Sequence, residues 1–446
     1  MKTDSVKDIT IRECTGCGAC SQVCPKDCIR ISESPQGFLH PSIQEKDCIH
    51  CGRCSRVCPS LAPGEARKPK DIWAAYALDG NIRSQSSSGG LFTLLARETL
   101  RRGGVVFGAG YDASWQVIIQ HTDHEEGLVP MRGSKYIQAH TGQSFQDCRD
   151  FLDNGRHVLF SGTPCQIAGL RNFLGKTYER LITVDVICHG AGSREVWRKY
   201  LHEIEESILT CGVSMGKGLR KLASLGLTLT KENARQALSI ASGKYGSDYL
   251  NAYSRNLILC PVCLRCPVKD FRSQSDLTLS DYRGAISSRE FGGTGKGLSM
   301  ILVHTDQGAE YLKKIPSSEI RMIQDSRTDL KNHNVSAFIS TKAHPKSESL
   351  FKELPHHKDV SALIRNCLSY PRKEMLLHPK ALARSILKRI KRIIDYHRSL
   401  RLAGEFSQKK SISHILHRDK TYGDDRLRLV LYLENSQTET EGTGTS

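Results

Sequence analysis

The feature that most constrains this chain is a four-cysteine run that occurs twice within its first 60 residues. The two copies are Cys14-x2-Cys17-x2-Cys20-x3-Cys24-Pro25 and Cys48-x2-Cys51-x2-Cys54-x3-Cys58-Pro59. The chain has 17 cysteines, an odd number, and its N-terminal sequence MKTDSVKDITIREC lacks the apolar core of a signal peptide. We therefore expect a cytoplasmic protein. In that reducing compartment, clustered cysteines predict metal or redox chemistry rather than a disulfide framework.

The spacing of each run suits a cubic cluster of four irons. Three thiolates come from one tight loop, a fourth follows at a distance, and the proline after it turns the chain away. In two-cluster ferredoxins that fourth cysteine ligates the other cluster. This predicts one ligand set of Cys14, Cys17, Cys20 and Cys58, and another of Cys48, Cys51, Cys54 and Cys24. Zinc, which also binds four cysteines, is the alternative, and two complete tandem runs disfavour it. Cys28 is left over, and we expect it to be a free buried thiol.

The rest of the chain has ordinary globular composition, with 39% hydrophobic and 25% charged residues among 446, which excludes wholesale disorder. After a linker rich in proline, glycine and lysine, strand, turn and helix patterns alternate, as in LITVDVICHGAGSREVWRKYL. This alternation predicts an α/β sheet with functional groups at the strand ends. The expected fold class is a mixed α/β (α+β) multidomain protein. Its predicted segments are 1–62, 70–155, 156–345, a basic helical extension over 346–432 and a disordered tail over 433–446.

Five of the cysteines in the predicted α/β region lie in positions that suggest a site. Cys165 in SGTPCQ follows one buried strand, and Cys188 in DVICHG follows the next strand. Two cysteines in equivalent positions favour a shared site over two separate buried thiols, which are the usual alternative. The segment CPVCLRC contains three cysteines separated by two residues each: Cys260, Cys263 and Cys266. They are three potential ligands of a metal site whose fourth ligand this segment does not supply. A zinc knuckle is the other interpretation of this segment.

A serine- and glycine-rich loop, SQSSSGGLFTL over 84–94, precedes a predicted helix. Backbone N–H groups at such a helix start can hold an anion or the polar edge of a cofactor, although an ordinary helix cap explains the pattern equally well. The chain has neither a G-x-G-x-x-G turn after a strand nor a P-loop. A dinucleotide, if bound, is therefore not held by an ordinary Rossmann turn.

The C-terminal region is strongly basic. Residues 371–420 contain 14 Lys and Arg against 4 Asp and Glu, and 379–401 has the apolar spacing of an amphipathic helix. Two interpretations stay open: the helix packs on the protein's own core, or it attaches peripherally to an anionic membrane. Specific nucleic-acid binding is not expected, because no base-reading motif accompanies the charge. No apolar stretch approaches the roughly 18 residues of a membrane span.

Several short motifs occur in a defined order behind the cysteine repeat. They are SSGGLFT (87–93), KYIQ (135–138), SGTPCQIAGLR (161–171), DVICHG (185–190), CPVCLRC (260–266), SDLTLSDYRG (275–284) and KGLSMILVHTDQG (296–308). Together with the N-terminal dicluster repeat, they resemble the beta subunit family of coenzyme F-420 hydrogenase and dehydrogenase over roughly residues 10–345. The resemblance implies an iron–sulfur flavoprotein that holds FAD beside a further 4Fe–4S cluster. Segments 70–155 and 156–345 would be the two parts of its beta-subunit domain.

The resemblance also implies roles for individual residues. Cys263 and Cys266 match the family's C-x2-C pair, and Cys165 and Cys188 match its TPC and CHG cysteines, so these four would bind the third cluster, with Cys260 as a competitor. The flavin pocket would be lined by Ser87, Ser88, Gly89, Gly90, Lys135 and Tyr136. The family's GDxWG is replaced here by SDYRG over 280–284, which weakens the prediction for the substrate side. No catalytic residue is assigned.

The function that the resemblance implies is an oxidoreductase. It would move electrons between a small-molecule hydride donor or acceptor (reduced coenzyme F-420 or a related molecule), FAD, the clusters and a redox partner protein or ferredoxin. A flavin suits this role because it exchanges both hydride and single electrons. Two alternatives are a ferredoxin-dependent reductase in cell-surface polysaccharide or other biosynthesis, and an electron-carrying adaptor without catalysis. The direction of electron flow is left open.

Overall fold

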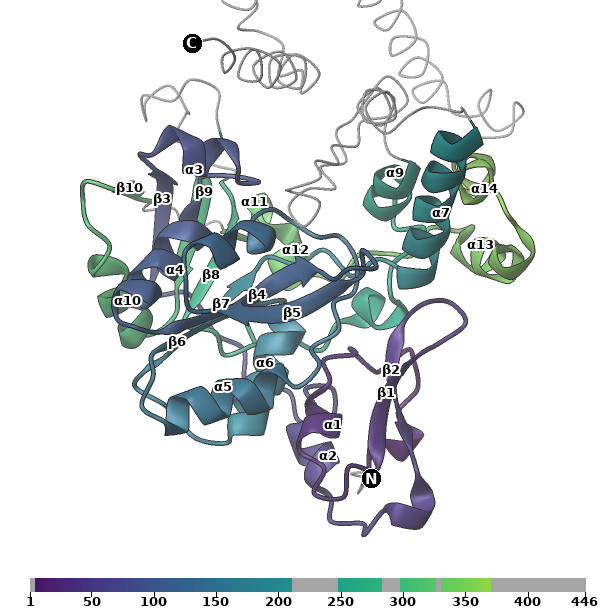
Figure 1. The fold of residues 1–446 in the computed structure, drawn as a ribbon, viewed down its shortest axis with the longest axis horizontal. Helices are drawn as coiled ribbons and strands as arrows, with labels where there is room; N and C mark the ends of the chain where they lie inside the picture. Colours follow the sequence, from purple (N-terminus) through teal and green to yellow (C-terminus); the bar gives the residue numbers. More distant parts are fainter. Residues whose placement is uncertain (1–4, 211–247, 283–296, 326–329, 370–446) are drawn as a thin grey trace, which may run out of the picture.

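The computed structural model describes residues 5–210, 248–282, 297–325 and 330–369. A small N-terminal unit lies at one end of the molecule, and a larger body built on one eight-stranded sheet follows (Figure 1). The basic helix predicted over 379–401 and the tail over 433–446 fall outside the described residues, so the membrane interpretation stays a prediction. Among the described helices, none has the length and apolar character needed to cross a membrane.

The N-terminal unit is a two-stranded hairpin flanked by two short helices. Its elements are α1 (Ala19–Gln22), β1 (Ile29–Glu33), β2 (Leu39–Ile43) and α2 (Arg53–Val57). The strands pair antiparallel with Ile31 opposite Pro41, which confirms the two short strands that CIRISES and GFLHPSI predict around a turn at SPQG. Each short helix follows a glycine in the left-handed region, Gly18 and Gly52, inside a cysteine run. The repeat in the sequence is therefore also a repeat of local backbone structure.

The body is a mixed sheet with its parallel strands in the middle. In sheet order the strands are β10 (Ile320–Gln324), β3 (Asp71–Ala77), β9 (Ser299–Val303), β8 (Leu277–Asp281), β7 (Leu181–Val186), β6 (Val158–Gly162), β4 (Val105–Tyr111) and β5 (Val117–Thr122). Strands β4, β6, β7 and β8 are parallel, whereas the outer pairs are antiparallel. Strands from 70–155 and 156–345 thus share one sheet. The carboxyl ends of β6 and β7 meet at the same edge.

Helices cover both faces of this sheet, as the alternation of side chains along its central strands requires. Leu159 of β6 packs on the face covered by α4 (Leu91–Arg101) and α10 (Asp306–Lys313). Its neighbours Val158 and Phe160 pack on the opposite face, under α5 (Ser144–Asp153) and α6 (Pro164–Leu174). Three shorter helices complete the body: α3 (Gly80–Ser84), α11 (Leu330–His333) and α12 (Val335–Phe338).

A separate group of helices packs beside the sheet (Figure 1). It consists of α7 (Arg194–Thr210), α9 (Asp248–Ser254), α13 (Ser347–Glu353) and α14 (Val360–Leu368). Trp197 and Tyr249 are fully buried in it, with ring centroids 5.0 Å apart in an edge-to-face arrangement. The same core includes Leu363 and Ile364, so the segment after 345 begins as part of the folded body.

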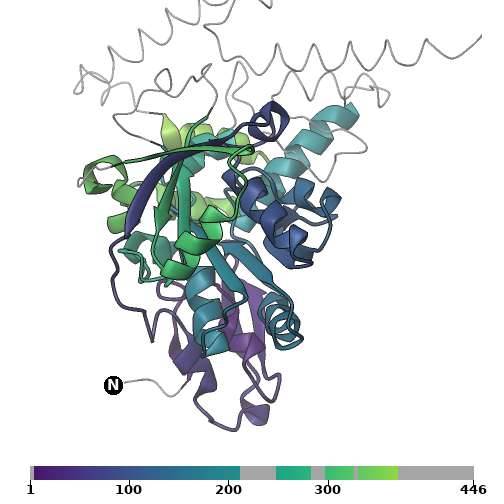
Figure 2. The same cartoon turned by 90° about the vertical axis from the view of Figure 1, so that its left-hand side faces the viewer.

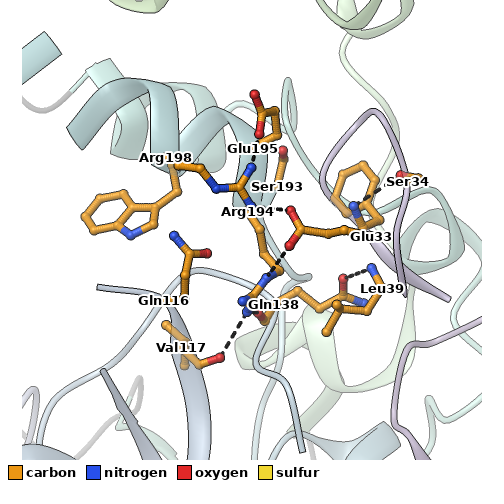
Figure 3. Close-up of polar contacts among 12 residues, drawn as sticks. Glu33, Ser34, Leu39, Gln116, Val117, Gln138, Ser193, Arg194, Glu195 and Arg198 are labelled. Carbon is orange, nitrogen blue, oxygen red and sulfur yellow. Dashed lines mark hydrogen bonds and ion pairs between the residues drawn. The ribbon is translucent and has the colours of Figure 1, made fainter. Parts of the chain in front are cut away.

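The N-terminal unit is docked on the body beside α5 and α6, and it forms the lower end of the molecule in both views (Figures 1 and 2). One anchor is Arg194 at the start of α7, which is 7% exposed. Its guanidinium contacts Glu33 of β1 at 3.1 Å and donates to the carbonyls of Val117 and Gln138, each at 3.0 Å (Figure 3). Because this cation is buried with all three partners, the two parts of the molecule are held in a defined relation.

Candidate electron-transfer site

The first predicted ligand set comes together in the N-terminal unit. Its four members are 7–8% exposed, and all four line one small cavity: Cys14, Cys17, Cys20 and Cys58. The remaining lining is mainly apolar and includes Val6, Ile9 and Ile31. Four buried thiols around an apolar cavity fit a 4Fe–4S cube, which takes cysteine thiolates and needs little else from the protein. We call this set the inner set.

The second predicted set is more exposed. Cys24, Cys48 and Cys54 are partly buried against the apolar interior of the unit, whereas Cys51 is exposed. The neighbouring Ile49 is 55% exposed. We call these four cysteines, 24, 48, 51 and 54, the outer set. It lies nearer to solvent than the inner set, which places it where an external redox partner can approach.

The surplus thiol, Cys28, lies at the outer set. Cys28 is 2% exposed, as expected for a buried thiol, and its Sγ lies 3.4 Å from the Sγ of Cys24. Burial, together with the neighbouring Cys24 and Cys48 thiols, raises the pKa of Cys28 to about 12. Cys28 is therefore a second candidate for the position that the sequence assigns to Cys24.

The four cysteines matched to the third cluster converge from three separate loops. Cys165 lies in the first turn of α6, after β6, and Cys188 follows the end of β7. Cys263 and Cys266 flank the end of a 3-10 helix over Pro261–Arg265. Burial and the nearby Cys266, Cys188 and Cys17 thiols raise the pKa of Cys165 well above its usual value. We call Cys165, Cys188, Cys263 and Cys266 the third set.

The competitor Cys260 is placed differently. It is 1% exposed and packs in an apolar cluster with Phe38 and Val262. Its carbonyl accepts from the Cys263 amide at 2.9 Å, and its thiol hydrogen-bonds the Cys263 thiol, which helps to raise the pKa of Cys263. Cys260 thus contacts the third set from its apolar side, whereas Cys188 faces Cys263 and Cys266.

Burial favours the neutral thiol form at the inner and third sets. It raises the pKa of Cys14 and of Cys188 to about 12 each. A cluster held at either set would therefore bind with loss of the thiol protons. Lys269 lies beside the third set: its ammonium donates to the Cys188 carbonyl at 2.9 Å, and its charge partly offsets the raised pKa of Cys188, Cys263 and Cys266.

Within the described ranges, no three His, Cys, Asp or Glu side chains are arranged to hold a single metal ion.

A buried ion pair connects the elements around the third set. Asp276, 2% exposed at its side chain, lies 2.6 Å from the guanidinium of Arg171 on α6. Its carboxylate also accepts from the amide and hydroxyl of Thr183, both at 2.8 Å, and from Thr305 at 2.8 Å. These contacts tie α6, β7 and the start of β8 together. Helix α6, which carries Cys165, is thereby fixed to β7, which precedes Cys188, and to β8, which follows Cys266.

A second buried carboxylate lies on β7, three residues before Cys188. Asp185 is 1% exposed and accepts from the hydroxyls of Ser273, at 2.5 Å, and Thr278. Burial raises the pKa of Asp185 to about 6. Thr278 also contacts His304 at 2.8 Å, and burial lowers the pKa of that imidazole to about 4. This polar network connects β7, β8 and β9 beneath the cysteine loops.

The glycines of the predicted flavin loop are packed tightly against the sheet. A Cβ on Gly89 would lie 2.6 Å from the Ala75 carbonyl and 2.9 Å from Ser299. Gly90 has φ +85 and precedes α4, where a Cβ would lie 2.9 Å from Ile82. Ser88 donates to the Leu298 carbonyl at 2.9 Å. The close approach of this loop to β3 and β9 is sufficient to explain both glycines.

The other predicted flavin residues form one continuous surface with this loop. The Ser87 hydroxyl accepts from the Ser134 amide at 2.7 Å, which joins the loop to the KYIQ segment. The Lys135 ammonium donates to the carbonyls of Pro130, Arg132 and Gly133 at 2.8–3.2 Å. Burial lowers the pKa of Lys135 to about 7, while its three carbonyl acceptors favour the charged form. Lys135 therefore organises its own loop.

Tyr136 connects this surface to the third set. It is 41% exposed, and its ring centroid lies 4.9 Å from that of Tyr253. Tyr253 donates to the Gly190 carbonyl at 3.0 Å and faces the third set, because the Cys188 and Cys263 thiols contribute to its raised pKa. His189 hydrogen-bonds Asn256 at 2.6 Å. The contacting rings of Tyr136 and Tyr253 thus form an aromatic wall between the predicted flavin residues and the third set.

Several residues of this region are not identifiable from the sequence. Asp185, Thr278 and His304 lie in three separate motifs, but nothing in the sequence shows that their side chains form one network, and Tyr253 lies in a stretch with no clear pattern. Lys269, in contrast, could have been found, because it follows the third-set cysteines directly in CLRCPVK. Asp276 is visible in the sequence only as a residue at a strand end, and the structure shows it fully paired.

The fold and the cysteine sets define an iron–sulfur electron-transfer protein with a ferredoxin-like unit joined to a mixed α/β body. Comparison with protein families gives the particular assignment. Residues 13–62 match the family described as "4Fe-4S dicluster domain". Residues 155–327 match the family described as the C terminus of the beta subunit of coenzyme F420 hydrogenase/dehydrogenase. These two matches, to a dicluster domain and to the C-terminal region of that beta-subunit family, confirm the resemblance over the two segments. All four cysteines of the third set lie within 155–327.

No curated protein matches the chain. Among solved structures, it is similar to a chain from "Xenon derivatization of the F420-reducing [NiFe] hydrogenase complex from Methanosarcina barkeri". The identity is 17%, the match covers 67% of this chain and 91% of that chain, and the TM-score is 0.39.

Proposed function

We propose that this protein is an iron–sulfur flavoenzyme that exchanges hydride with coenzyme F-420 or a related molecule and passes the electrons to a redox partner. FAD would lie on the surface formed by Ser87 to Gly90, Lys135 and Tyr136. The third, inner and outer cysteine sets would each hold one 4Fe–4S cluster. The family described for residues 155–327 supports the substrate class.

One observation carries this proposal: the three cysteine sets follow one another through the molecule. Cys17 of the inner set packs on Gly169 of α6, and α6 begins beside Cys165 of the third set. Cys54 of the outer set in turn contributes to the raised pKa of Cys20 and Cys58 in the inner set. Clusters held at these positions would form a path for single electrons from the body to the exposed loop at Cys51.

The chain's own residues supply placement and insulation. FAD, when bound, converts between hydride and single-electron transfer. Tyr136 and Tyr253 form the wall between its expected position and the third set. The apolar lining around the inner set keeps water from the cluster, and hydrogen bonds to cysteine sulfurs tune its potential.

A second candidate function is an electron-carrying adaptor without flavin. It is favoured by the internal hydrogen bonds of Ser87 and Lys135, which already satisfy the polar groups that a flavin would otherwise meet. The two candidates share the three clusters and differ in the flavin. One preparation can therefore distinguish them.

The test is iron and flavin analysis of protein purified without oxygen. We expect about 12 irons per chain, from three cubes of four, together with one FAD. Mössbauer spectra would identify the cluster type. Cys263→Ser should lose about 4 irons, whereas the matched control Cys260→Ser should lose none. A wild-type count near 8 would remove the third cluster, and clusters without flavin would favour the adaptor.

A further inference from the structure

Gln138 links the N-terminal unit to the body at the inner set. It belongs to the KYIQ segment, is 5% exposed, and lies at the centre of the contacts in Figure 3. Its side-chain amide donates to the Thr15 carbonyl at 3.1 Å and accepts from the Leu39 amide at 2.7 Å. Its backbone N–H donates to the Gly192 carbonyl at 3.0 Å. One buried residue therefore contacts the inner-set loop, the hairpin and the loop that follows Cys188.

The contact with Thr15 fixes one peptide group of the inner-set loop. The carbonyl of the Thr15–Gly16 peptide accepts from Gln138, and the N–H of the same peptide donates to the Sγ of Cys14 at 3.3 Å. The carbonyl and the N–H of a peptide point in opposite directions, because the peptide is planar and trans. Holding the carbonyl at Gln138 therefore keeps the N–H directed at the sulfur.

The local backbone is shaped for this approach. Gly16 has φ +68, and a Cβ at this position would overlap the Gln138 amide and lie 2.9 Å from the Leu39 carbonyl. The next glycine of the run repeats the arrangement: Thr141 donates to the Cys17 carbonyl at 3.0 Å, and a Cβ on Gly18 would overlap the Thr141 hydroxyl. Residues 138–141 thus form a strap against the inner-set loop.

Hydrogen bonds to cysteine sulfurs are one of the factors that set the potential of an iron–sulfur cluster. Reduction adds negative charge to the cluster, so an N–H directed at a ligand sulfur stabilises the reduced form. We propose that Gln138, a residue of the body, is a positioning residue that raises the reduction potential of the inner cluster through the Thr15–Gly16 peptide. This inference rests on the proposed function, because it requires a cluster at the inner set.

Because Gln138 belongs to the body, the reduction potential of the inner cluster should depend on whether the N-terminal unit is docked there. Gln138 lies two residues after Tyr136 of the predicted flavin surface, and its N–H holds the loop that leads from Cys188. The N-terminal unit on its own would lack this donor. The reduction potential of the inner cluster in the docked unit should therefore be higher than in the free unit.

The test is a redox titration of the whole protein followed by electron paramagnetic resonance. Cys17→Ser identifies which reduction step of the titration belongs to the inner cluster, because this variant changes an inner-set ligand. Gln138→Leu should move that step to a more negative potential and leave the other steps in place. Glu33→Gln is the matched control, since it weakens the ion pairs to Arg194 and Arg198 at the same interface without contacting the inner-set loop.

Gln138→Asn provides a gentler second variant, because its amide is one methylene too short to reach Thr15, and it should shift the same step in the same direction. An unchanged inner step in either variant, with iron content intact, would overturn the role of Gln138. An equal shift in Glu33→Gln would also overturn it, because docking in general would then be the cause. Absence of an inner-cluster signal from the wild type would instead refute the proposed function.

Discussion

At the scale of single residues, Asp276 shows how a side chain far from any ligand position supports the candidate site. Its carboxylate is paired with Arg171 and also accepts hydrogen bonds from Thr183 and Thr305. A buried charge with a full set of partners is tolerated, but the removal of one partner leaves the others uncompensated. The contribution of this pair is therefore mainly the placement of α6 and β7, which carry Cys165 and lead to Cys188.

We expect Asp276→Ala to destabilise the protein by about 3–5 kcal/mol, because it leaves the Arg171 guanidinium without its carboxylate. The double variant Arg171→Met, Asp276→Leu should cost less than Asp276→Ala alone, because no unpaired charge is left. The measurement is urea denaturation followed by tryptophan fluorescence. Asp281→Ala is the control, since Asp281 is exposed at the end of β8 and should change stability by less than about 0.5 kcal/mol. Equal effects at both aspartates would contradict this account.

At the scale of elements, α6 joins the two parts of the molecule. Its N-terminus is capped by Thr163 with Gln166 in a capping box, and Pro164 occupies the first turn. The helix carries Cys165 at one end and packs on α1 through Gly169, where a Cβ would lie 2.9 Å from the Cys17 sulfur. Glycine inside a helix costs up to about 1 kcal/mol relative to alanine. The close approach of the Cys17 sulfur explains why a glycine occupies position 169.

Gly169→Ala should therefore lower the thermal midpoint and the retention of the inner cluster, although alanine is the better helix former. Gly169→Val should have a larger effect, because its side chain would force α1 away from α6. Iron content and thermal denaturation of the two variants give the result. A higher midpoint with full iron content in Gly169→Ala would show that the glycine is not required by Cys17.

At the scale of the whole molecule, the three cysteine sets form a series that runs from the covered third set to the exposed outer set. The third set lies among the loops of the body, the inner set is covered by the strap and α6, and the outer set ends at the exposed Cys51 and Ile49. An external redox partner can therefore reach the outer set most readily. The exposed loop at Cys51 and the predicted flavin surface lie at opposite ends of the series of cysteine sets.

Cys51→Ala should block electron exit to an external acceptor and leave reduction of the flavin by its donor intact, because that step precedes the clusters. Anaerobic stopped-flow absorbance can follow flavin bleaching and acceptor reduction separately. Cys148→Ala is the matched control, because Cys148 is a buried thiol of α5 outside the three cysteine sets, and electron exit should survive. Loss of flavin reduction in Cys51→Ala, with FAD still bound, would mean that the proposed order of carriers is wrong.

Much of the architecture was determined by sequence alone, because the signals concerned are local. The two cysteine runs specify dicluster spacing within a few residues, the strands around SPQG follow from alternation, and the strand–turn–helix units place Cys165 and Cys188 at neighbouring strand ends. The family resemblance added Cys263 and Cys266. These features depend on residues close together in the chain, so their patterns are visible without a structure.

The tertiary structure alone decided how these pieces meet. Gln138 contacts a peptide 123 residues earlier in the chain, and Asp276 pairs with Arg171 across 105 residues. It also placed Cys28 beside Cys24, gave Lys135 three carbonyl partners of its own loop, and separated Cys260 onto the apolar side of the third set. No periodicity encodes such contacts, because they arise from the packing of one element on another, and packing depends on the joint shape and polarity of surfaces that are remote in sequence.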